Sequence, residues 1–471
     1  MHMLDFDEMK KISYSKFSAV AKSGFSKATQ AAKSGAIKAK QTVKNRGATN
    51  PGVGQSGEQY VVALDIGTEF VKVLIGKVLD GTNQIEIIGV GREHQALSDM
   101  QAGAISDIAG VVHNCDEALS RAEQQAGVSV RTAVIGIAGE LVKGTTTTVR
   151  ISRKTATKPL DVAEMEKIIR LVQERAEKKA RTQMAWELGG KDVEVRLVNS
   201  ALVSIEIDGY PVTNPIGFQG RDVVVQLYTA FAPMIHIGAL ERVAVELDLD
   251  LLAVAAEPFA VARSVIGDEV NTGFSAILMD VGGGTTDIAV INEGGVQGTE
   301  MFGIGGRAYT RAIERDMGVE FDVAEKMKLG LGFIEDKPNI PASKVKAVDT
   351  ALRKTLGVWI SGVELALAEF PQLDHLPHKI LLCGGGSSLD MLMEALQQSN
   401  WYKDLPFTRK PVVQHIQPSQ IVGIKDRTGN AADHTFITAM GLLRVGLDTL
   451  HYAGSSGGNS VKEKIDRILR T

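Results

Sequence analysis

The same acidic hairpin pattern occurs twice in this chain, at positions far apart in the sequence. Residues 62–76 read VALDIGTEFVKVLIG, and residues 277–291 read ILMDVGGGTTDIAVI. In each stretch an apolar run ends in an aspartate, Asp65 or Asp280, which precedes a Gly/Thr turn and a second β-rich run. Such a pattern predicts a β-hairpin. A chain that builds this hairpin twice is expected to contain two related halves.

Both turns carry the chemistry of a phosphate-binding site. Glycines let backbone N–H groups approach phosphate oxygens, and the hydroxyl groups of Thr68, Thr285 and Thr286 add donors. Bare phosphate would repel an aspartate, so we expect a Mg²⁺ ion between them, reached directly or through water. An ordinary hairpin stays an open alternative for the first turn, whereas the three glycines of DVGGGTTD would weaken a hairpin unless something approaches closely. Two facing hairpins would clamp the phosphate tail of one nucleotide.

A third glycine turn suits the same ligand. In KILLCGGGSSLDML a buried-strand run leads into Gly384, Gly385 and Gly386, and a helix is expected to begin near Ser387 or Ser388. Backbone N–H groups at a helix N-terminus bind anions, so this turn suits the sugar–phosphate part of a nucleotide. One GGG motif alone would be a weak indication, but a third turn after two acidic hairpins strengthens it.

Composition shifts and turn residues divide the chain into segments. Three β-rich runs from residue 60 predict an antiparallel meander, and a helix is expected over residues 108–125. Residues 143–221 read as an insertion, and residues 222–233 are expected to resume the first half. The predicted segments are a basic flexible arm and linker (1–57), the first part of domain I (58–139), an inserted α+β subdomain (140–225), the continuation of domain I (226–271), domain II with a helix-rich part at about 307–372 (272–453), and a Gly/Ser linker with an amphipathic C-terminal helix (454–471).

The two ends of the chain are basic. Residues 1–50 carry ten Lys and Arg against three Asp and Glu, although the whole chain has a formal net charge of −4. For this arm a membrane contact, a nucleic-acid contact and a solvated tail are open alternatives. The C-terminal SVKEKIDRILRT predicts a helix with a narrow apolar face beside Lys and Arg, which favours a membrane surface or a partner groove. The residues of that face are Val461, Ile465, Ile468 and Leu469.

Composition argues against several other classes of protein. No run of about eighteen uncharged apolar residues occurs that could span a bilayer as a helix. The sequence contains two cysteines, Cys115 and Cys383, and no Cys/His spacing typical of a zinc site. We therefore expect a cytosolic protein without a disulfide framework.

The order of the motifs resembles the actin-like ATPase superfamily and, within it, the FtsA family of bacterial cell-division proteins. The matching stretches include ALDIGTEFVKVLIG, AGVSVRTAVIGIAGE, AAEPFAVARSV, DVGGGTTDIAVINEGGV and GNAADHTFITAMGLLRVG, and the likeness covers about residues 58–450. It implies an α/β fold: an actin-like (ribonuclease H-like) duplicated two-domain ATPase fold with an inserted α+β subdomain. Three segments depart from the family pattern, so the sequence does not predict which partners they contact. They are residues 1–50 and the stretches EKKARTQMAWELGGKDVE and LGFIEDKPNIPASK.

The resemblance also implies roles for the motif residues, with ATP and Mg²⁺ as cofactors. Asp65 and Asp280 would hold Mg²⁺ through water and are, with Glu257, the candidate catalytic residues. Glu257 of AAEPFA would position the attacking water; its alternative is a capping role before Pro258. The implied nucleotide-binding residues are Asp65, Gly67, Thr68 and Lys72 in the first phosphate motif, Asp280, Gly282, Gly283, Gly284, Thr285, Thr286 and Asp287 in the second, Gly384, Gly385 and Gly386 in the adenosine motif, and Glu325 and Lys328 beside the adenine and ribose. An ordinary charged helix face is the alternative for Glu325 and Lys328, and a solvent-pointing side chain is the alternative for Lys72.

Three functions fit this resemblance. The first is an FtsA-like cell-division protein that binds ATP, polymerises, and tethers FtsZ filaments to the cytoplasmic membrane through the FtsZ C-terminal tail. It would lie on the inner face of the membrane at the division site, contact other division proteins, bind no nucleic acid and hydrolyse ATP slowly at most. The second is a PilM-like ATP-binding scaffold of type IV pilus assembly. The free amphipathic C-terminal helix favours the first function over this one. The third is a sugar or acetate kinase, for which no acceptor-pocket signature stands out.

Overall fold

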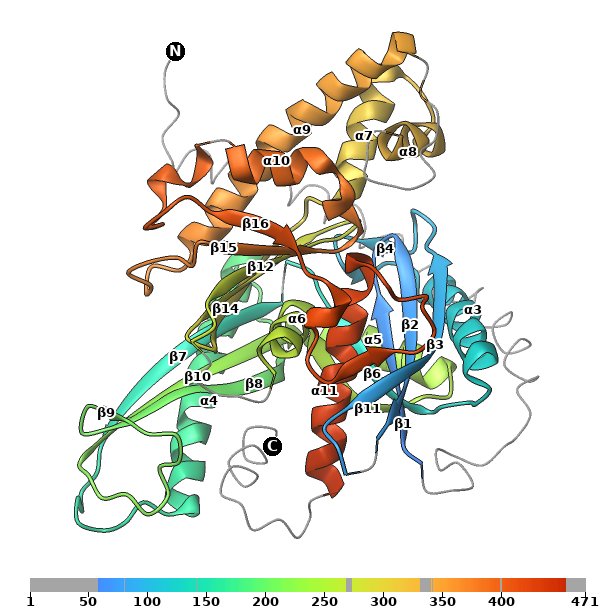
Figure 1. Cartoon of the computed structure of the whole chain (residues 1–471). Helices are drawn as coiled ribbons and strands as arrows, with labels where there is room; N and C mark the ends of the chain where they lie inside the picture. The colour runs from blue at the N-terminus through green and yellow to red at the C-terminus, as the bar shows by residue number, and fades with distance from the viewer. Residues whose placement is uncertain are drawn as a thin grey trace.

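The computed structural model of the protein describes residues 58–454 except 80, 141, 268–272, 331–339, 341 and 399. Two β-sheets lie on either side of helices α6 (Glu257–Ile266) and α11 (Ile437–Gly454) (Figure 1). The predicted basic arm (1–57) and the predicted apolar face of Val461, Ile465, Ile468 and Leu469 lie outside the described residues.

Among the described residues the first sheet has six strands. β1, β2 and β3 form the antiparallel meander that the sequence predicts, and β6 and β11 continue the sheet in parallel beyond β1. Such strands are covered on both faces, which explains their nearly continuous apolar sequences. The strands are, in order, β11 (Asp250–Ala256), β6 (Thr132–Ile137), β1 (Tyr60–Ile66), β2 (Phe70–Val78), β3 (Ile85–His94) and β17 (Ile424–Asp426).

The second sheet repeats this topology. β12, β13 and β14 form another antiparallel meander, and β15 and β16 continue it in parallel beyond β12. This repetition is the duplication that the two hairpin motifs predict. Its nine strands within the described ranges are, in order, β16 (Val412–His415), β15 (Lys379–Cys383), β12 (Ala276–Val281), β13 (Thr286–Asn292), β14 (Gly295–Phe302), β7 (Lys143–Ser152), β10 (Asp222–Pro233), β8 (Val195–Ile207) and β9 (Tyr210–Pro211).

The inserted part joins the second sheet through the short β14–β7 pairing. Helix α4 (Val162–Glu187) packs on its strands, and β10 pairs along its whole length with β7 and β8. Residues 222–233 therefore do not resume the first sheet, and the expected boundary at residue 225 falls inside a strand. Most side chains of β10 are buried, so its sequence is largely apolar, like that of a strand in the first sheet. We propose that the insertion extends to Pro233.

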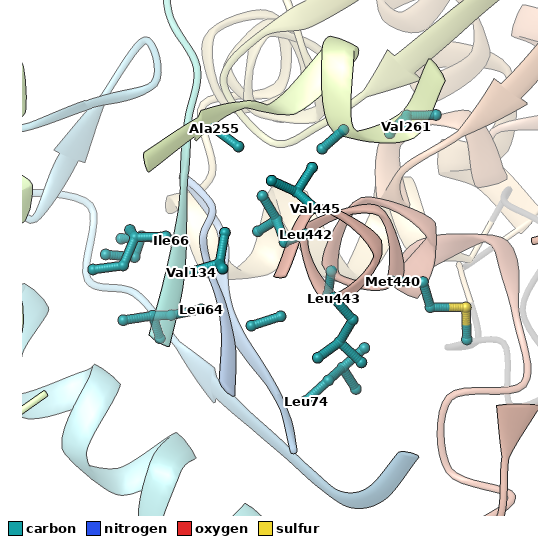
Figure 2. Close-up of a cluster of buried hydrophobic side chains, with 14 of the residues drawn as sticks. Leu64, Ile66, Leu74, Val134, Ala255, Val261, Met440, Leu442, Leu443 and Val445 are labelled. Carbon is teal, nitrogen blue, oxygen red and sulfur yellow. The ribbon is translucent and has the colours of Figure 1, made fainter. Parts of the chain in front are cut away.

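The core between the sheets is built around α11 and α6. Figure 2 shows Leu442 and Leu443 of α11 converging with Leu64 of β1 and Val134 of β6, and all four are fully buried. A second core lies under the helix-rich part of the second half, around Trp359. The remaining helices are α3 (Ile108–Ala126), α5 (Met234–Glu246), α7 (Gly306–Met317), α8 (Phe321–Leu329), α9 (Ala342–Ala368) and α10 (Asp390–Gln398); short elements near the site are β4 (Met100–Gln101), β5 (Ala104–Ile105) and the 3₁₀ turns η2 (Gly385–Ser388) and η5 (His434–Phe436).

None of the helices in the described part of the chain combines the length and the apolar character needed to cross a membrane. Cys115 and Cys383 are both buried free thiols.

Candidate functional site

Both predicted hairpins form, and each has its aspartate near the end of its first strand. Asp65 in β1 is the cross-strand partner of Lys72 in β2, and Asp280 in β12 is the partner of Asp287 in β13. Cross-strand partners project from the same face of a sheet, so each aspartate lies beside the side chain opposite it. The first hairpin therefore presents a carboxylate with a cation, and the second presents two carboxyl groups.

The tips of the two hairpins face each other closely. A Cβ atom on Gly284 would lie 2.6 Å from Thr68 Oγ1, and one on Gly283 would lie 2.8 Å from Glu69 Cβ. A side chain at either glycine would push the tips apart. Two motifs that are distant in sequence thus meet through backbone that glycine leaves uncovered.

Lys72 belongs to this site and does not point to solvent. Its Nζ atom lies 3.1 Å from Asp65 Oδ2, and its side chain is 13% exposed. Burial alone would lower the pKa of Lys72, but the carboxylates of Asp65 and Asp280 outweigh that effect and raise it. The ammonium group is thus held charged between the two hairpins.

The carboxyl groups of the second hairpin are buried and interact strongly. Thr438, near the N-terminus of α11, donates a hydrogen bond to Asp280 Oδ2, while Thr285 Oγ1 donates to Asp287 Oδ2 over 3.0 Å. Burial raises the pKa of Asp280, although the Thr438 hydrogen bond and Lys72 oppose the rise, and burial together with the Asp280 carboxylate raises the pKa of Asp287 further. Asp287 Oδ1 is buried without a hydrogen-bond partner among the described residues. A dication or its water ligands would relieve both features.

The third glycine turn wraps around Asp280. Gly384 has φ +81°, a left-handed conformation that glycine adopts without strain, and a side chain there would collide with Asp280. A Cβ atom on Gly386 would lie 2.8 Å from the carbonyl oxygens of Val281 and Gly282, whereas one on Gly385 would meet no atom within 4 Å. Gly385 therefore borders open space beside the second hairpin.

Glu257 is the first residue of α6, and its carboxyl group lies beneath the hairpins. Burial raises the pKa of Glu257 well above its usual range, and Asp65, Asp287 and Asp280 raise it further. A Cβ atom on Gly136 would lie 2.7 Å from Glu257 Oε1, so the strand backbone approaches the acid closely. Glu257 also borders a cavity of about 10 Å³, which is roughly the space of one water. The N-cap of this helix is Ala256, and Glu257 lies in the first turn directly before Pro258.

Glu325 and Lys328 form an internal cluster behind the second hairpin. Lys328 Nζ lies 2.7 Å from Glu325 Oε2 and donates to the Gly306 carbonyl (3.1 Å) and Thr310 Oγ1 (2.9 Å). Lys328 is only 7% exposed. The pair is therefore more than a charged helix face, and through Gly306 it touches the start of α7, which is hydrogen-bonded to the hairpin. The Gly306 N–H donates to the Gly282 carbonyl over 2.9 Å.

The protein groups could hold a metal ion only with the help of water or ligand oxygens. Within the described ranges, no three His, Cys, Asp or Glu side chains come close enough to bind a metal by themselves. Mg²⁺ ordinarily keeps several waters and takes one or two carboxylates with substrate phosphates. Asp65 and Asp280 fit that pattern, which is the through-water mode expected from the sequence.

Some residues of the site were not identified from the sequence. Thr438 lies in the stretch GNAADHTFITAMG, where nothing but its place beside a motif marks it. Glu69 and Arg307 form an ion pair across the two hairpins, with Nε and Oε2 2.7 Å apart. The signal for Arg307 was its position directly after the glycines of IGG.

Comparison with known proteins gives a consistent picture. The sequence model of the family described as "Cell division protein FtsA" matches residues 277–441. The cell division protein FtsA of Bacillus subtilis is 27% identical over 277 residues, which cover 58% of this chain and 58% of that protein. The cell division protein FtsA of Pseudomonas aeruginosa is 24% identical over 412 residues, which cover 83% of this chain and 90% of that protein.

Among solved structures, the PilM-PilN type IV pilus biogenesis complex is similar to this chain. The TM-score is 0.57 at 16% sequence identity, and the match covers 82% of this chain and 98% of the other. At this identity the likeness concerns the fold alone.

Proposed function

Because the chain belongs to the FtsA family and has the actin-like ATPase fold that its sequence predicts, we propose that this cell-division protein binds Mg·ATP between its two hairpin tips. The observation that carries the proposal is that the two hairpin tips meet at Gly283 and Gly284 while the third glycine turn packs against the buried carboxyl group of Asp280. The third turn borders open space at Gly385, where backbone could come into close contact with phosphate oxygens. The phosphates would lie beside the junction of the two hairpin tips, and the sugar would lie beside Gly385.

Magnesium would be held through water by Asp65 and Asp280, and it would screen the charge of the phosphates. The unpartnered oxygen of Asp287 supports a hydrated cation at this place. Lys72 lies between the two hairpins and would contact the phosphates while it neutralises Asp65. Glu325 and Lys328 would support the wall of the site through the Gly306 loop.

Hydrolysis is expected to be slow, because burial raises the pKa of Glu257 and so disfavours the ionised form that could accept a proton. Glu257→Ala should keep ATP affinity within about threefold and lower turnover by roughly tenfold or more. Calorimetry and phosphate release measure the two quantities on the same protein. An unchanged rate would reassign Glu257 to a structural role at the start of α6.

In division, the protein would polymerise with ATP and attach FtsZ filaments to the cytoplasmic membrane. The apolar face of Val461, Ile465, Ile468 and Leu469, which lies outside the described residues, would insert into the membrane surface. Four aliphatic side chains give modest binding, which filament avidity would multiply. Ile468→Glu should sharply reduce co-sedimentation with anionic vesicles, whereas deletion of residues 1–50 should reduce it mainly at low salt. Undiminished binding of Ile468→Glu would contradict the tether.

The second candidate is a scaffold of type IV pilus assembly, which the fold alone would equally allow. The sequence relatives favour cell division, since they are cell division proteins. Copurification separates the two: a peptide of the FtsZ C-terminal tail should retain this protein on a column, and pilus inner-membrane proteins should not. The reverse result would support the pilus scaffold.

A further inference from the structure

Arg307 lies at the point where the two hairpin tips meet. It is the second residue of α7, and its backbone N–H donates to the Gly283 carbonyl over 2.8 Å. Its side chain reaches the opposite hairpin, where Nε donates to Glu69 Oε2 over 2.7 Å. Arg307 thus contacts both hairpins, the second through its backbone N–H and the first through its guanidinium group, and its side chain is only 14% exposed.

The guanidinium group is not fully used by these contacts. Nη1 makes a long hydrogen bond of 3.4 Å to the Met100 carbonyl. Nη2 is buried, and in the described part of the chain it has no hydrogen-bond partner. A buried guanidinium donor left unpaired is costly, and such a group is typically completed by a ligand or by ordered water. Guanidinium forks match the oxygens of carboxylate and phosphate groups.

Glu69 fixes the orientation of Arg307. Its second oxygen, Oε1, lies 2.7 Å from His94 Nε2, so both carboxylate oxygens are in use. Burial would raise the pKa of Glu69, but Arg307 and His94 together lower it. The carboxylate therefore stays ionised and holds Nε, while Nη2 on the same guanidinium group is left without a hydrogen-bond partner among the described residues.

We propose that Arg307 binds the terminal phosphate of the nucleotide and so makes this protein prefer a nucleoside triphosphate to a diphosphate. The assignment rests on the proposed nucleotide binding. Glu69 acts as the positioning residue, and Nη2 donates to a phosphate oxygen that a diphosphate does not carry at this place. Because Arg307 connects the two halves, the same contact couples the terminal phosphate to closure of the two hairpins.

Calorimetry tests the assignment with two probes, Mg·ADP and the magnesium complex of a non-hydrolysable β,γ-imido ATP analogue. Arg307→Ala should weaken binding of the ATP analogue by roughly tenfold to a hundredfold, the range for a hydrogen bond to a charged group, and weaken ADP by less than about threefold. Arg307→Lys, which keeps the charge but loses the fork, should lie in between. Glu69→Gln should cost less ATP-analogue affinity than Arg307→Ala.

Arg311→Ala is the matched control, because Arg311 lies on the same helix, is 56% exposed and pairs with Glu314. It should bind both probes as the unaltered protein does. Both Arg307 variants are first checked for an unchanged melting temperature. If they weaken the binding of both probes equally, or the binding of neither, the phosphate assignment is wrong. If the unaltered protein binds neither probe, the proposed function fails and this assignment fails with it.

Discussion

At the scale of single residues, the site concentrates carboxyl groups in a buried volume. Asp65, Asp280, Asp287 and Glu257 are each less than 9% exposed, and all lie close enough to influence one another. Lys72 compensates only part of this charge. Burial and mutual repulsion therefore hold protons on the carboxyl groups whose pKa is raised, until a dication favours their ionised forms.

Binding of Mg·ATP should therefore release protons. The pKa values of Glu257, Asp280 and Asp287 are raised, so these groups bind more protons in the free cleft than beside a dication. Affinity should consequently increase as pH rises towards those pKa values and level off above them. Calorimetry in two buffers of different ionisation enthalpy measures the protons released. The Glu257→Gln variant should release fewer protons on binding. Identical binding heats in the two buffers would show that the carboxyl groups do not titrate on binding.

The structure brings close together several residues that their type and spacing single out in the sequence. Asp65, Asp280 and Gly384 were predicted because a carboxylate or a glycine in a turn after an apolar strand needs a chemical reason. The Glu69–Arg307 pair could not be predicted, since it depends on how two distant hairpins are placed in space. Thr438 was missed for the same reason, because a threonine at the start of a helix carries no distinctive signal.

At the scale of elements, α6 and α11 are in direct backbone contact at Gly441. A Cβ atom on Gly441 would lie 2.7 Å from the carbonyl oxygen of Ala260, so the two helices can lie this close only with glycine at that position. These helices lie between the two sheets and carry both Glu257 and Thr438. The packing of α6 on α11 thus helps to set the distance between Glu257 and Thr438.

Gly441→Ala should destabilise the protein by about 1–3 kcal/mol, the usual cost of forcing extra volume into a packed core. Gly357→Ala on α9 is the control, because a Cβ atom there meets nothing within 4 Å. That change should be neutral or stabilise by up to about 1 kcal/mol, since alanine favours the helix. Chemical denaturation measures both. Equal stability of the two variants would contradict the close packing of α6 on α11.

The junction between β14 and the inserted strands should respond to pH. Burial raises the pKa of Glu300 in β14 to about 7, with Lys143 opposing and Glu369 and Glu187 adding to the rise. The pKa of Glu300 is higher in the folded protein than in the unfolded chain, so the folded protein is favoured most below about pH 4.5. As the pH rises to about 7, the free energy of unfolding falls by at most about 3 kcal/mol. Glu300→Gln should therefore stabilise the protein at pH 8 and have little effect at pH 4.5. A melting-temperature difference that is the same at both pH values would refute this.

Element boundaries were harder to predict than the elements themselves. The meander β1–β3, the helix α3 and the strand β15 follow from periodicity in the sequence. The sequence of β10 predicts a return to the first half, because a largely apolar strand has the same pattern whichever sheet it enters. Only its pairing with β7 and β8 reveals its place.

At the scale of the whole molecule, the fold is one unit built twice with an insertion. The related halves contribute one hairpin each, so the site exists only where they meet (Figure 1). The ends of the chain, where the sequence predicts contact with the membrane, stay a prediction. The central claim is the proposed function: Mg·ATP would bind where the hairpin tips meet, beside the third glycine turn.

Gly385 offers the most direct test of that claim. A side chain at Gly283 would meet Glu69 and disturb the hairpins themselves, whereas one at Gly385 enters open space without touching the protein. Isothermal titration of Mg·ATP should show binding to the unaltered protein and to the control variant Gly357→Val. Gly385→Val should bind at least about tenfold more weakly at an unchanged melting temperature. Equal affinity of Gly385→Val and the unaltered protein would contradict a nucleotide in this cleft.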